Sequence, residues 1–221
     1  MNRKRRQILP ISRQKPMKLE LPKPSAFSGK TLCQSLKKRK TVREISDREI
    51  PLQVLSNLLW AAMGVNRKSG PFGITGRTAA SASNSQEIDL YVAMQDAIYL
   101  YDPFQHRLDP VVVGDLRKHA IGRGQANFGD RAPIRLIFVA DLHRLTHTKG
   151  FQEPGLKDPE VQKSYYFVDT GLIAGNVYLF AAAQGLAAWF HNCDKPALRT
   201  FLKLRDDQRV LFGQTVGYAA R

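Results

Sequence analysis

Residues 159–185 read PEVQKSYYFVDTGLIAGNVYLFAAAQG, and this stretch forms the longest helix that the sequence predicts. One stripe of the helix collects residues at three- and four-residue spacing: Val161, Tyr165, Val168, Leu172, Asn176, Leu179 and Ala183. From Gly171 onward the apolar character extends almost all the way around the helix. A helix that is apolar on every side is buried, so we expect this one to lie in the core or against a second subunit.

The rest of the chain carries a mixture of strand and helix patterns. Apolar–polar alternation predicts strands at IDLYVAM (88–94) and AIYLYD (97–102), with a third within HRLDPVVVG (106–114), which together form a meander. Apolar, β-rich runs predict three more strands, at IRLIFVAD (134–141), LAAWFH (186–191) and RVLFGQTVGY (209–218). Helical spacing predicts further helices within 31–38, 51–63 and 195–204. A meander combined with long helices indicates the α+β class.

Length and composition fit one domain with an N-terminal extension. The 221 residues, of which 43% are apolar, suffice for a single sizeable core. Residues 1–30 carry basic residues, four prolines and no sustained periodicity, which predicts an extended or disordered arm ahead of a domain at 31–221. We expect no membrane-spanning segment and no secretory signal, and therefore a cytoplasmic protein without a membrane partner.

The positive charge is concentrated near the N-terminus. The formal net charge is +15, and residues 1–50 hold 15 Lys or Arg against 4 Asp or Glu, so +11 of it lies there. This excess allows an alternative interpretation, a basic nucleic-acid-binding module. The sequence contains no recognised nucleic-acid-binding motif, so we expect nucleic acid to bind at most weakly, through the arm.

The cysteines and histidines predict neither a disulfide framework nor a metal site. Cys33 and Cys193 are far apart and belong to no C-x-x-C pair. His143 and His147 are four residues apart, but only Asp141 lies nearby as a third ligand, and an exposed pair is the better interpretation.

Four segments together resemble the nitroreductase family of flavin enzymes. They are RKTVR (39–43), RTAASASNSQE (77–87), DTGLIAGNVYLFAAAQGL (169–186) and LFGQTVGYAAR (211–221), in the order and spacing of that family. The resemblance covers residues 31–221 and is nearest to small single-domain members related to the dehydrogenases that oxidise azoline rings. It implies an α+β fold with a central antiparallel sheet flanked by helices. It also implies a homodimer with two FMN molecules at the interface, each contacted by both subunits.

The basic segment matches the phosphate-binding frame of the family at Arg39, Thr41 and Arg43. FMN ends in a phosphate monoester that carries about −1.5 to −2 charges at neutral pH. Two guanidiniums can fork onto phosphate oxygens, and the hydroxyl between them adds a short donor. Residues two apart in an extended segment point to the same side, so this spacing suits an extended segment. The lysines outside the frame are expected to be solvated: Lys37, Lys38 and Lys40.

The resemblance implies further cofactor contacts along the chain. In the serine-rich loop the matching positions are Ser81, Ser83 and Asn84, and Gln125 matches a position near the pyrimidine ring. His191, Asn192 and Cys193 match the positions where the family brings backbone donors to flavin N5 and O4. Arg221 matches a second basic phosphate contact. Many members have prolines where this chain has Ala80 and Glu87. At His191 a structural role is favoured over that of a proton donor.

The resemblance also implies a ping-pong transfer of hydride from NAD(P)H through flavin N5 to a small acceptor such as a nitroaromatic or a quinone. The flavin performs this chemistry, so no side chain is assigned a catalytic role. The sequence has no G-x-G-x-x-G fingerprint, as expected if the nicotinamide is a visiting substrate. The alternative within the same fold is a flavoprotein that does not use nicotinamide, acting in a specialised ring oxidation or cleavage or as a flavin carrier.

Overall fold

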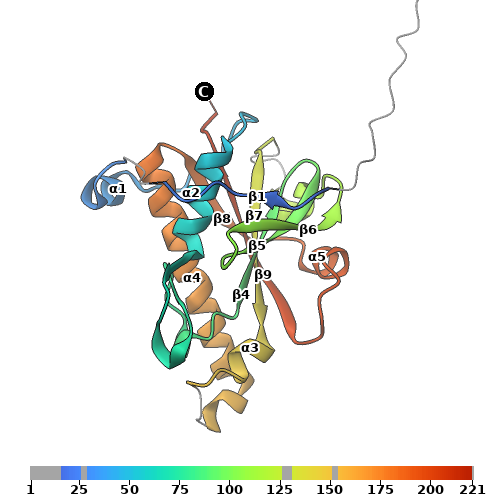
Figure 1. Cartoon of the computed structure of the whole chain (residues 1–221). Helices are drawn as coiled ribbons and strands as arrows, with labels where there is room; N and C mark the ends of the chain where they lie inside the picture. Colours follow the sequence, from blue (N-terminus) through green and yellow to red (C-terminus); the bar gives the residue numbers. More distant parts are fainter. Residues whose placement is uncertain (1–15, 26–28, 126–130, 151–153, 221) are drawn as a thin grey trace, which may run out of the picture.

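A seven-stranded antiparallel sheet forms the centre of the protein (Figure 1). The computed structural model describes residues 16–25, 29–125, 131–150 and 154–220. In the order in which they lie side by side, the strands are β1 (Leu19–Glu20), β6 (Arg107–Val113), β5 (Ala97–Asp102), β4 (Ile88–Ala93), β7 (Ile134–Asp141), β9 (Gln208–Gly217) and β8 (Ala187–His191). The predicted meander is confirmed as β4–β5–β6. A small second sheet pairs β2 (Val65–Arg67) with β3 (Gly76–Arg77).

Helices flank the sheet, which confirms the predicted α+β class. The α-helices are α1 (Leu32–Lys38), α2 (Leu52–Met63), α3 (Leu142–Thr146), α4 (Pro159–Gln184) and α5 (Lys195–Phe201). Short 3₁₀ turns lie at Pro71–Gly73, Ala82–Asn84, Arg117–Ala120, Arg123–Gln125 and Pro154–Lys157.

The sheet buries side chains on both of its faces. On one face, Leu58 of α2 and Val177 of α4 pack with Phe138 of β7, and all three side chains are fully buried. On the opposite face, Leu198 of α5 packs with Ile137 of β7. Figure 1 shows α2 and α4 on one side of the strands and α5 on the other. Each such side chain stabilises the fold by about 1.5–3 kcal/mol.

Local signals in the sequence set the ends of α4. The side chain of Asp158 accepts a hydrogen bond from the N–H of Glu160 at 2.9 Å, and Pro159 occupies the first helical position. Gly185 ends the helix with a φ of 73°, a left-handed conformation that suits glycine. The helix predicted from residues 159–185 is therefore confirmed, with its last residue at Gln184.

The surface of α4 is only partly covered within one chain. Val168 is 60% exposed and Leu172 is 44% exposed, and a Cβ added at Gly171 or Gly175 would meet no atom within 4 Å. These four residues form an apolar stripe, which is exposed at Val168, Gly171 and Leu172 and half-buried at Gly175. Within one chain, α4 is therefore not buried on every side.

The length and composition of α4 would also allow it to cross a membrane. The expectation that no segment has these properties is wrong for this helix, although its contacts give a different reason for its apolar character. It packs on the sheet and on α2, Asp169 is 3% exposed, and Asn176 donates to the carbonyls of Ala62 and Thr78 at 3.3 and 3.4 Å. Its polar side chains are thus used inside the protein.

Part of the predicted N-terminal arm lies on the domain. Leu19 pairs with Leu108 of β6, and Leu21 is buried. The N–H of Ser25 donates to Asn57 Oδ1 of α2 at 3.0 Å. A strand of two residues is too short to show periodicity in the sequence, so this pairing had no local signal. Residues 1–15 and 26–28 of the predicted arm lie outside the described residues.

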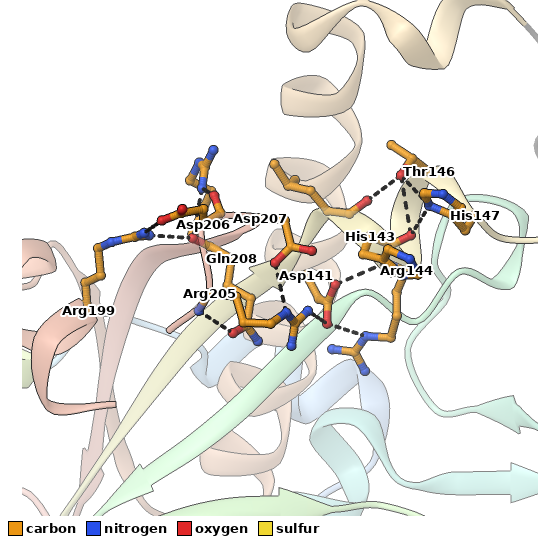
Figure 2. Close-up of polar contacts among 12 residues, drawn as sticks. Asp141, His143, Arg144, Thr146, His147, Arg199, Arg205, Asp206, Asp207 and Gln208 are labelled. Atoms are coloured by element: carbon orange, nitrogen blue, oxygen red, sulfur yellow. Dashed lines mark hydrogen bonds and ion pairs between the residues drawn. The ribbon is translucent and has the colours of Figure 1, made fainter. Parts of the chain in front are cut away.

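A network of charged side chains joins the end of β7 to the start of β9 (Figure 2). Arg205 Nη2 lies 2.9 Å from Asp141 Oδ2, and Arg144 Nε lies 3.4 Å from the same oxygen. Arg144 also contacts Asp89 of β4 at 2.6 Å. Burial alone would raise the pKa of Asp141, but hydrogen bonds from Arg205 and from the Arg144 backbone hold it below its usual range.

Candidate active site

The segment that carries the phosphate-binding frame runs in an extended conformation along the edge of β8. The N–H of Val42 donates to the carbonyl of Ala188 at 3.0 Å, and the N–H of Ala220 donates to the carbonyl of Glu44 at 2.9 Å. Val42 and Ile45 pack with Ala187 in a small cluster. These contacts hold the segment against the sheet.

Arg39, Thr41 and Arg43 are exposed on this segment. The guanidinium carbon of Arg39 lies 5.4 Å from the ring centre of Tyr178, and that of Arg43 lies 5.6 Å from the ring centre of Trp189. Within the described part of the chain, no carboxylate forms an ion pair with either guanidinium. Cation–π contacts therefore orient both groups and leave their N–H donors available to an anion.

Tyr178 of α4 is a site residue that sequence reasoning missed. Its hydroxyl accepts a hydrogen bond from the N–H of Phe190 at 2.8 Å and lies 3.2 Å from Thr41 Oγ1. Because the N–H of Phe190 occupies an acceptor position on the phenol oxygen, the phenol proton can be donated to Thr41. The proton of Thr41 then remains available to a ligand. No local pattern marks this tyrosine, which lies 137 residues from Thr41.

Two hollows flank the segment. The larger, of about 500 Å³, has a floor of apolar residues that includes Val42, Tyr178 and Ala188. The smaller, of about 410 Å³, is lined by residues 40–44. Four lysines line the larger hollow: Lys30, Lys37, Lys38 and Lys40. The last three are those that the sequence predicts to be solvated, and all three are exposed.

The free edge of β8 leads from this segment toward residues 190–193. In an antiparallel strand, alternate residues direct their N–H and C=O groups to the same edge. The carbonyl of Ala188 and the N–H of Phe190 both meet partners on this edge. The strand ends at His191, and Asn192 follows it directly. The neighbouring N–H of Cys193 donates to Asn192 Oδ1 at 3.0 Å. Asn192 itself is exposed.

His191 and Cys193 point into the domain. His191 Nδ1 lies 2.8 Å from the carbonyl oxygen of Asn192, and Nε2 lies 2.7 Å from Thr215 Oγ1. Burial lowers the pKa of His191 to about 4, so the ring is neutral at pH 7. Burial raises the pKa of the Cys193 thiol to about 12. Both side chains are therefore enclosed by other groups of the domain and present no free face at the site. For His191 this suits the structural role that the sequence favours.

Gln125 lies next to Asn192. Both border Gly122, where an added Cβ would lie 3.2 Å from Gln125 Oε1 and 3.7 Å from Asn192 Cβ. Gln125 Oε1 is buried and accepts no hydrogen bond from any group in the described ranges. An acceptor in such a position can be satisfied by a donor from a ligand.

The serine-rich loop forms a separate cluster. Ser81 Oγ accepts from the N–H of Gln86 at 3.0 Å, and Asn84 Oδ1 accepts from Gln86 Nε2 at 2.9 Å. Ser83 and Asn84 have φ values of 49° and 55°. Ala82 N donates to Asp169 Oδ2 of α4 at 2.9 Å, which ties the loop to the helix. Sequence reasoning missed Gln86, although it belongs to the same short segment.

One chain does not bring all the predicted site residues together. The serine-rich loop meets α4 at Asp169, whereas the frame meets it at Tyr178, nine residues later. Nine residues correspond to about 14 Å along a helix and to roughly opposite sides of it. The frame, Gln125 and the residues after β8 gather around the edge of β8, and Ser81, Ser83 and Asn84 lie elsewhere. Arg221 lies outside the described residues, directly after Ala220.

Comparison with known proteins identifies the family of this chain. The sequence profile of the nitroreductase family matches residues 36–218. The chain belongs to the nitroreductase family. It is 28% identical over 181 residues to a Methanocaldococcus jannaschii protein assigned to the nitroreductases, which covers 76% of this chain and 82% of that protein.

Solved structures agree with the family. A Ralstonia eutropha protein assigned to the nitroreductases is 33% identical, with a TM-score of 0.77 over 93% of this chain and 91% of that one. Nitroreductase A of Vibrio parahaemolyticus is 19% identical and shares the fold, with a TM-score of 0.59 over 86% of this chain and 67% of that one. The resemblance stated from the sequence is thus confirmed, and this member of the family is a nitroreductase-like oxidoreductase.

Proposed function

We propose that this nitroreductase-family protein is an FMN-dependent oxidoreductase that passes a hydride from NAD(P)H to a small acceptor such as a nitroaromatic or a quinone. The observation that carries the proposal is the frame itself. Arg39, Thr41 and Arg43 present two guanidiniums and a hydroxyl from one extended segment, and among the described residues neither guanidinium has a carboxylate partner. Such a group of donors suits a dianionic phosphate.

The residues around the frame fit the phosphate end of FMN. Thr41 offers its hydroxyl proton because the phenol of Tyr178 can donate to its oxygen. The four lysines of the larger hollow add positive charge without a carboxylate among the residues that line it. They would strengthen the local field for an anion without fixing its position, because a lysine ammonium is a flexible point charge.

The residues after β8 fit the ring end. The N–H of Asn192, directly after the strand, would supply a donor there, and Gln125 Oε1 is a buried acceptor near this residue. A flat ring with a donor–acceptor edge satisfies both. From Ala188 to Asn192 the strand covers about 13 Å, so the frame and the ring-binding groups lie at two ends of one track. At the ring end, the backbone of residue 192 would be used and the side chains of His191 and Cys193 would not.

We further propose that a second copy of the chain completes each site. The serine-rich loop lies on the opposite side of α4 from the frame, so one copy cannot place both on one cofactor. The apolar stripe of Val168, Gly171, Leu172 and Gly175 offers a surface for the second copy, since its glycines let another backbone approach closely. The loop of one copy would then line the ring held by the frame of the other.

When bound, FMN would supply the hydride-accepting and hydride-donating centre of the reaction. The protein would contribute position and charge. Arg39 and Arg43 hold the anionic end, the Asn192 N–H orients the ring edge, and the neutral ring of His191 keeps that backbone in place through its contact with the Asn192 carbonyl. The lack of a dinucleotide-binding fingerprint fits a nicotinamide nucleotide that enters, reacts and leaves.

The test begins with the absorption spectrum of the purified protein, before and after incubation with FMN. We expect the visible bands of a bound flavin and their bleaching by NADH or NADPH without oxygen. Turnover with a nitroaromatic or a quinone should follow. A protein that takes up no FMN would refute the proposal. Uptake without bleaching by either nucleotide would support a flavoprotein that does not use nicotinamide.

A further inference from the structure

Two buried carboxyl groups border one small cavity beneath the serine-rich loop. Glu87, just before β4, is 0% exposed, and Asp169 of α4 is 3% exposed. Both border a cavity of about 10 Å³, which has room for no more than about one water molecule. The pair is therefore shielded from bulk solvent.

One oxygen atom of this pair has no hydrogen-bond donor among the described residues. Glu87 Oε2 accepts from Ser85 Oγ at 2.6 Å, and Asp169 Oδ2 accepts from the N–H of Ala82 at 2.9 Å. Glu87 Oε1 is buried and has no donor within the ranges that the structure describes. Two ionised carboxylates cannot donate to each other, whereas one proton between them supplies the missing donor.

Two arginines lie near the pair, and within the described residues neither forms an ion pair with Glu87 or Asp169. Arg144 of α3 donates to the backbone carbonyl of Glu87 at 3.2 Å, and its guanidinium also contacts the carboxylates of Asp89 and Asp141. Arg77 of β3 borders the same cavity, with its guanidinium carbon 5.2 Å from the ring centre of Phe104. Burial, and then the charge of Glu87, raise the pKa of Asp169 to about 7.

The loop above the pair has a conformation that needs support. Ser83, Asn84 and Gln86 have φ values of 49°, 55° and 53°, in the left-handed region that is costly for residues other than glycine. The bond from Ala82 N to Asp169 is the tether between this loop and α4. Any change that pushes Asp169 and Glu87 apart would act on that tether.

We propose that Glu87 and Asp169 share one proton and that this proton positions the loop of residues 81–86. Loss of the proton to solvent leaves two negative charges in a buried space, and their repulsion loosens the loop from α4. The consequence for the site rests on the proposed function, in which this loop lines the flavin. Glu87 and Asp169 would then be positioning residues that set the upper pH limit of cofactor retention.

The shared proton can be tested without any cofactor. The thermal midpoint of FMN-free protein would be measured from about pH 6 to about pH 8, one unit either side of the pKa of about 7. A raised carboxyl pKa makes the folded state hold the proton more tightly, so stability falls as the pH rises toward that pKa. We expect a fall of about 2–4 °C in the wild type. In Glu87→Gln, the side-chain amide donates the hydrogen bond that the shared proton provides in the wild type. The thermal midpoint of this variant should therefore not change with pH over this range.

Two comparisons keep this test decisive. Glu160→Gln changes an exposed carboxyl group, with a side chain that is 78% exposed, and should retain the wild-type slope. Equal slopes in the wild type and Glu87→Gln would overturn the proposal. If Glu87→Gln does not fold, infrared spectra of the wild type decide. The carbonyl band of a protonated carboxyl group should be present below pH 7 and vanish above it, and its absence throughout would overturn the shared proton.

The effect on the cofactor is measured separately. FMN affinity of the wild type should fall above pH 7 by at most about tenfold per pH unit, as expected when one proton is required for the binding conformation. Glu87→Gln should lack this fall, and the ratio of the two proteins cancels the titration of the FMN phosphate. A parallel fall in both proteins would refute the positioning role. Failure of both to bind FMN at any pH would instead refute the proposed function, while the thermal and infrared results would still decide the shared proton.

Discussion

The hydroxyl of Thr41 lies 3.2 Å from the hydroxyl of Tyr178, although 137 residues separate them along the chain. This contact joins the phosphate-binding frame to α4, and the bond from the Phe190 N–H to the same phenol joins both to β8. Three elements therefore meet at one tyrosine. Any movement of α4 relative to β8 would displace the hydroxyl that the frame offers to an anion.

Removal of the Tyr178 hydroxyl should weaken FMN binding. Tyr178→Phe keeps the ring beneath the Arg39 guanidinium but leaves the N–H of Phe190 without its acceptor and Thr41 without its partner. We expect a loss of stability of about 1–2 kcal/mol. FMN affinity, measured by quenching of flavin fluorescence, should fall about three- to tenfold.

Two substitutions of Thr41 provide the matched comparison. Thr41→Ser keeps the hydroxyl and should bind FMN almost as the wild type does, whereas Thr41→Val should not. The double variant Thr41→Val with Tyr178→Phe should lose less affinity than the two single losses combined, because the groups act through one contact. Strict additivity would show that the two hydroxyls act independently.

The arginines of the frame should matter more than a surface lysine. Arg39→Ala and Arg43→Ala each remove a guanidinium that is held over an aromatic ring and has no carboxylate partner among the described residues. Hydrogen bonds to charged groups contribute about 1.5–3 kcal/mol, so FMN affinity should fall about 10- to 100-fold in each variant. Lys203→Ala, at an exposed position just after α5, is the control for charge alone. An equal loss in Lys203→Ala would mean that total charge matters and the frame does not.

The same comparison can rank the lysines of the larger hollow. Lys38 is exposed, directly precedes Arg39 and lines this hollow together with Tyr178. Lys38→Ala should weaken FMN binding by about three- to tenfold, between the effects of Arg39→Ala and Lys203→Ala, because an exposed charge acts through a screened field. The difference between Lys38→Ala and the arginine variants should widen at high salt if the lysine acts only at a distance, because salt screens its field more than the direct hydrogen bonds of the arginines.

Sequence patterns predicted those features of the fold that local chemistry determines. Asp158, Pro159 and Gly185 mark the ends of α4, and the β-rich run between Pro133 and Asp141 marks β7. Contacts between distant segments were not predictable in this way. The contact of Tyr178 with Thr41 and the pairing of Glu87 with Asp169 arise from packing across the whole chain, and neither residue of a pair carries a local signal for the other.

The acid limb of the stability profile should depend on Asp141. Its pKa is lowered in the folded protein by hydrogen bonds from Arg205 and from the Arg144 backbone, against the effect of burial. A depressed carboxyl pKa contributes stability above the unfolded pKa of about 3.9, and that stability is lost as the pH falls through the folded value. Asp141→Asn should therefore lower the free energy of unfolding at pH 7 by about 1–3 kcal/mol and flatten its fall in acid.

The network in Figure 2 also supplies the control for this measurement. Asp206 pairs with Arg199 at 2.6 Å, but its side chain is fully exposed. Asp206→Asn should leave the denaturation midpoint and its pH dependence unchanged, since exposed ion pairs contribute little. A similar acid limb in Asp141→Asn and the wild type would show that other carboxylates determine acid stability.

The apolar stripe of α4 should be required both for dimerisation and for cofactor binding. Leu172→Arg places a charge on the stripe between Gly171 and Gly175, where it would remain solvated in a monomer but be buried against a second copy. We expect this variant to elute as a monomer, with its molar mass measured by light scattering, and to keep its fold by circular dichroism. It should also lose most of its FMN affinity, because the serine-rich loop of the second copy would no longer reach the ring. Val113→Glu, at a 62% exposed position on β6, is the control for surface charge and should remain dimeric. A monomeric Leu172→Arg that binds FMN as tightly as the wild type would show that one chain forms the whole site, and the separation of the loop and the frame along α4 would then need another explanation.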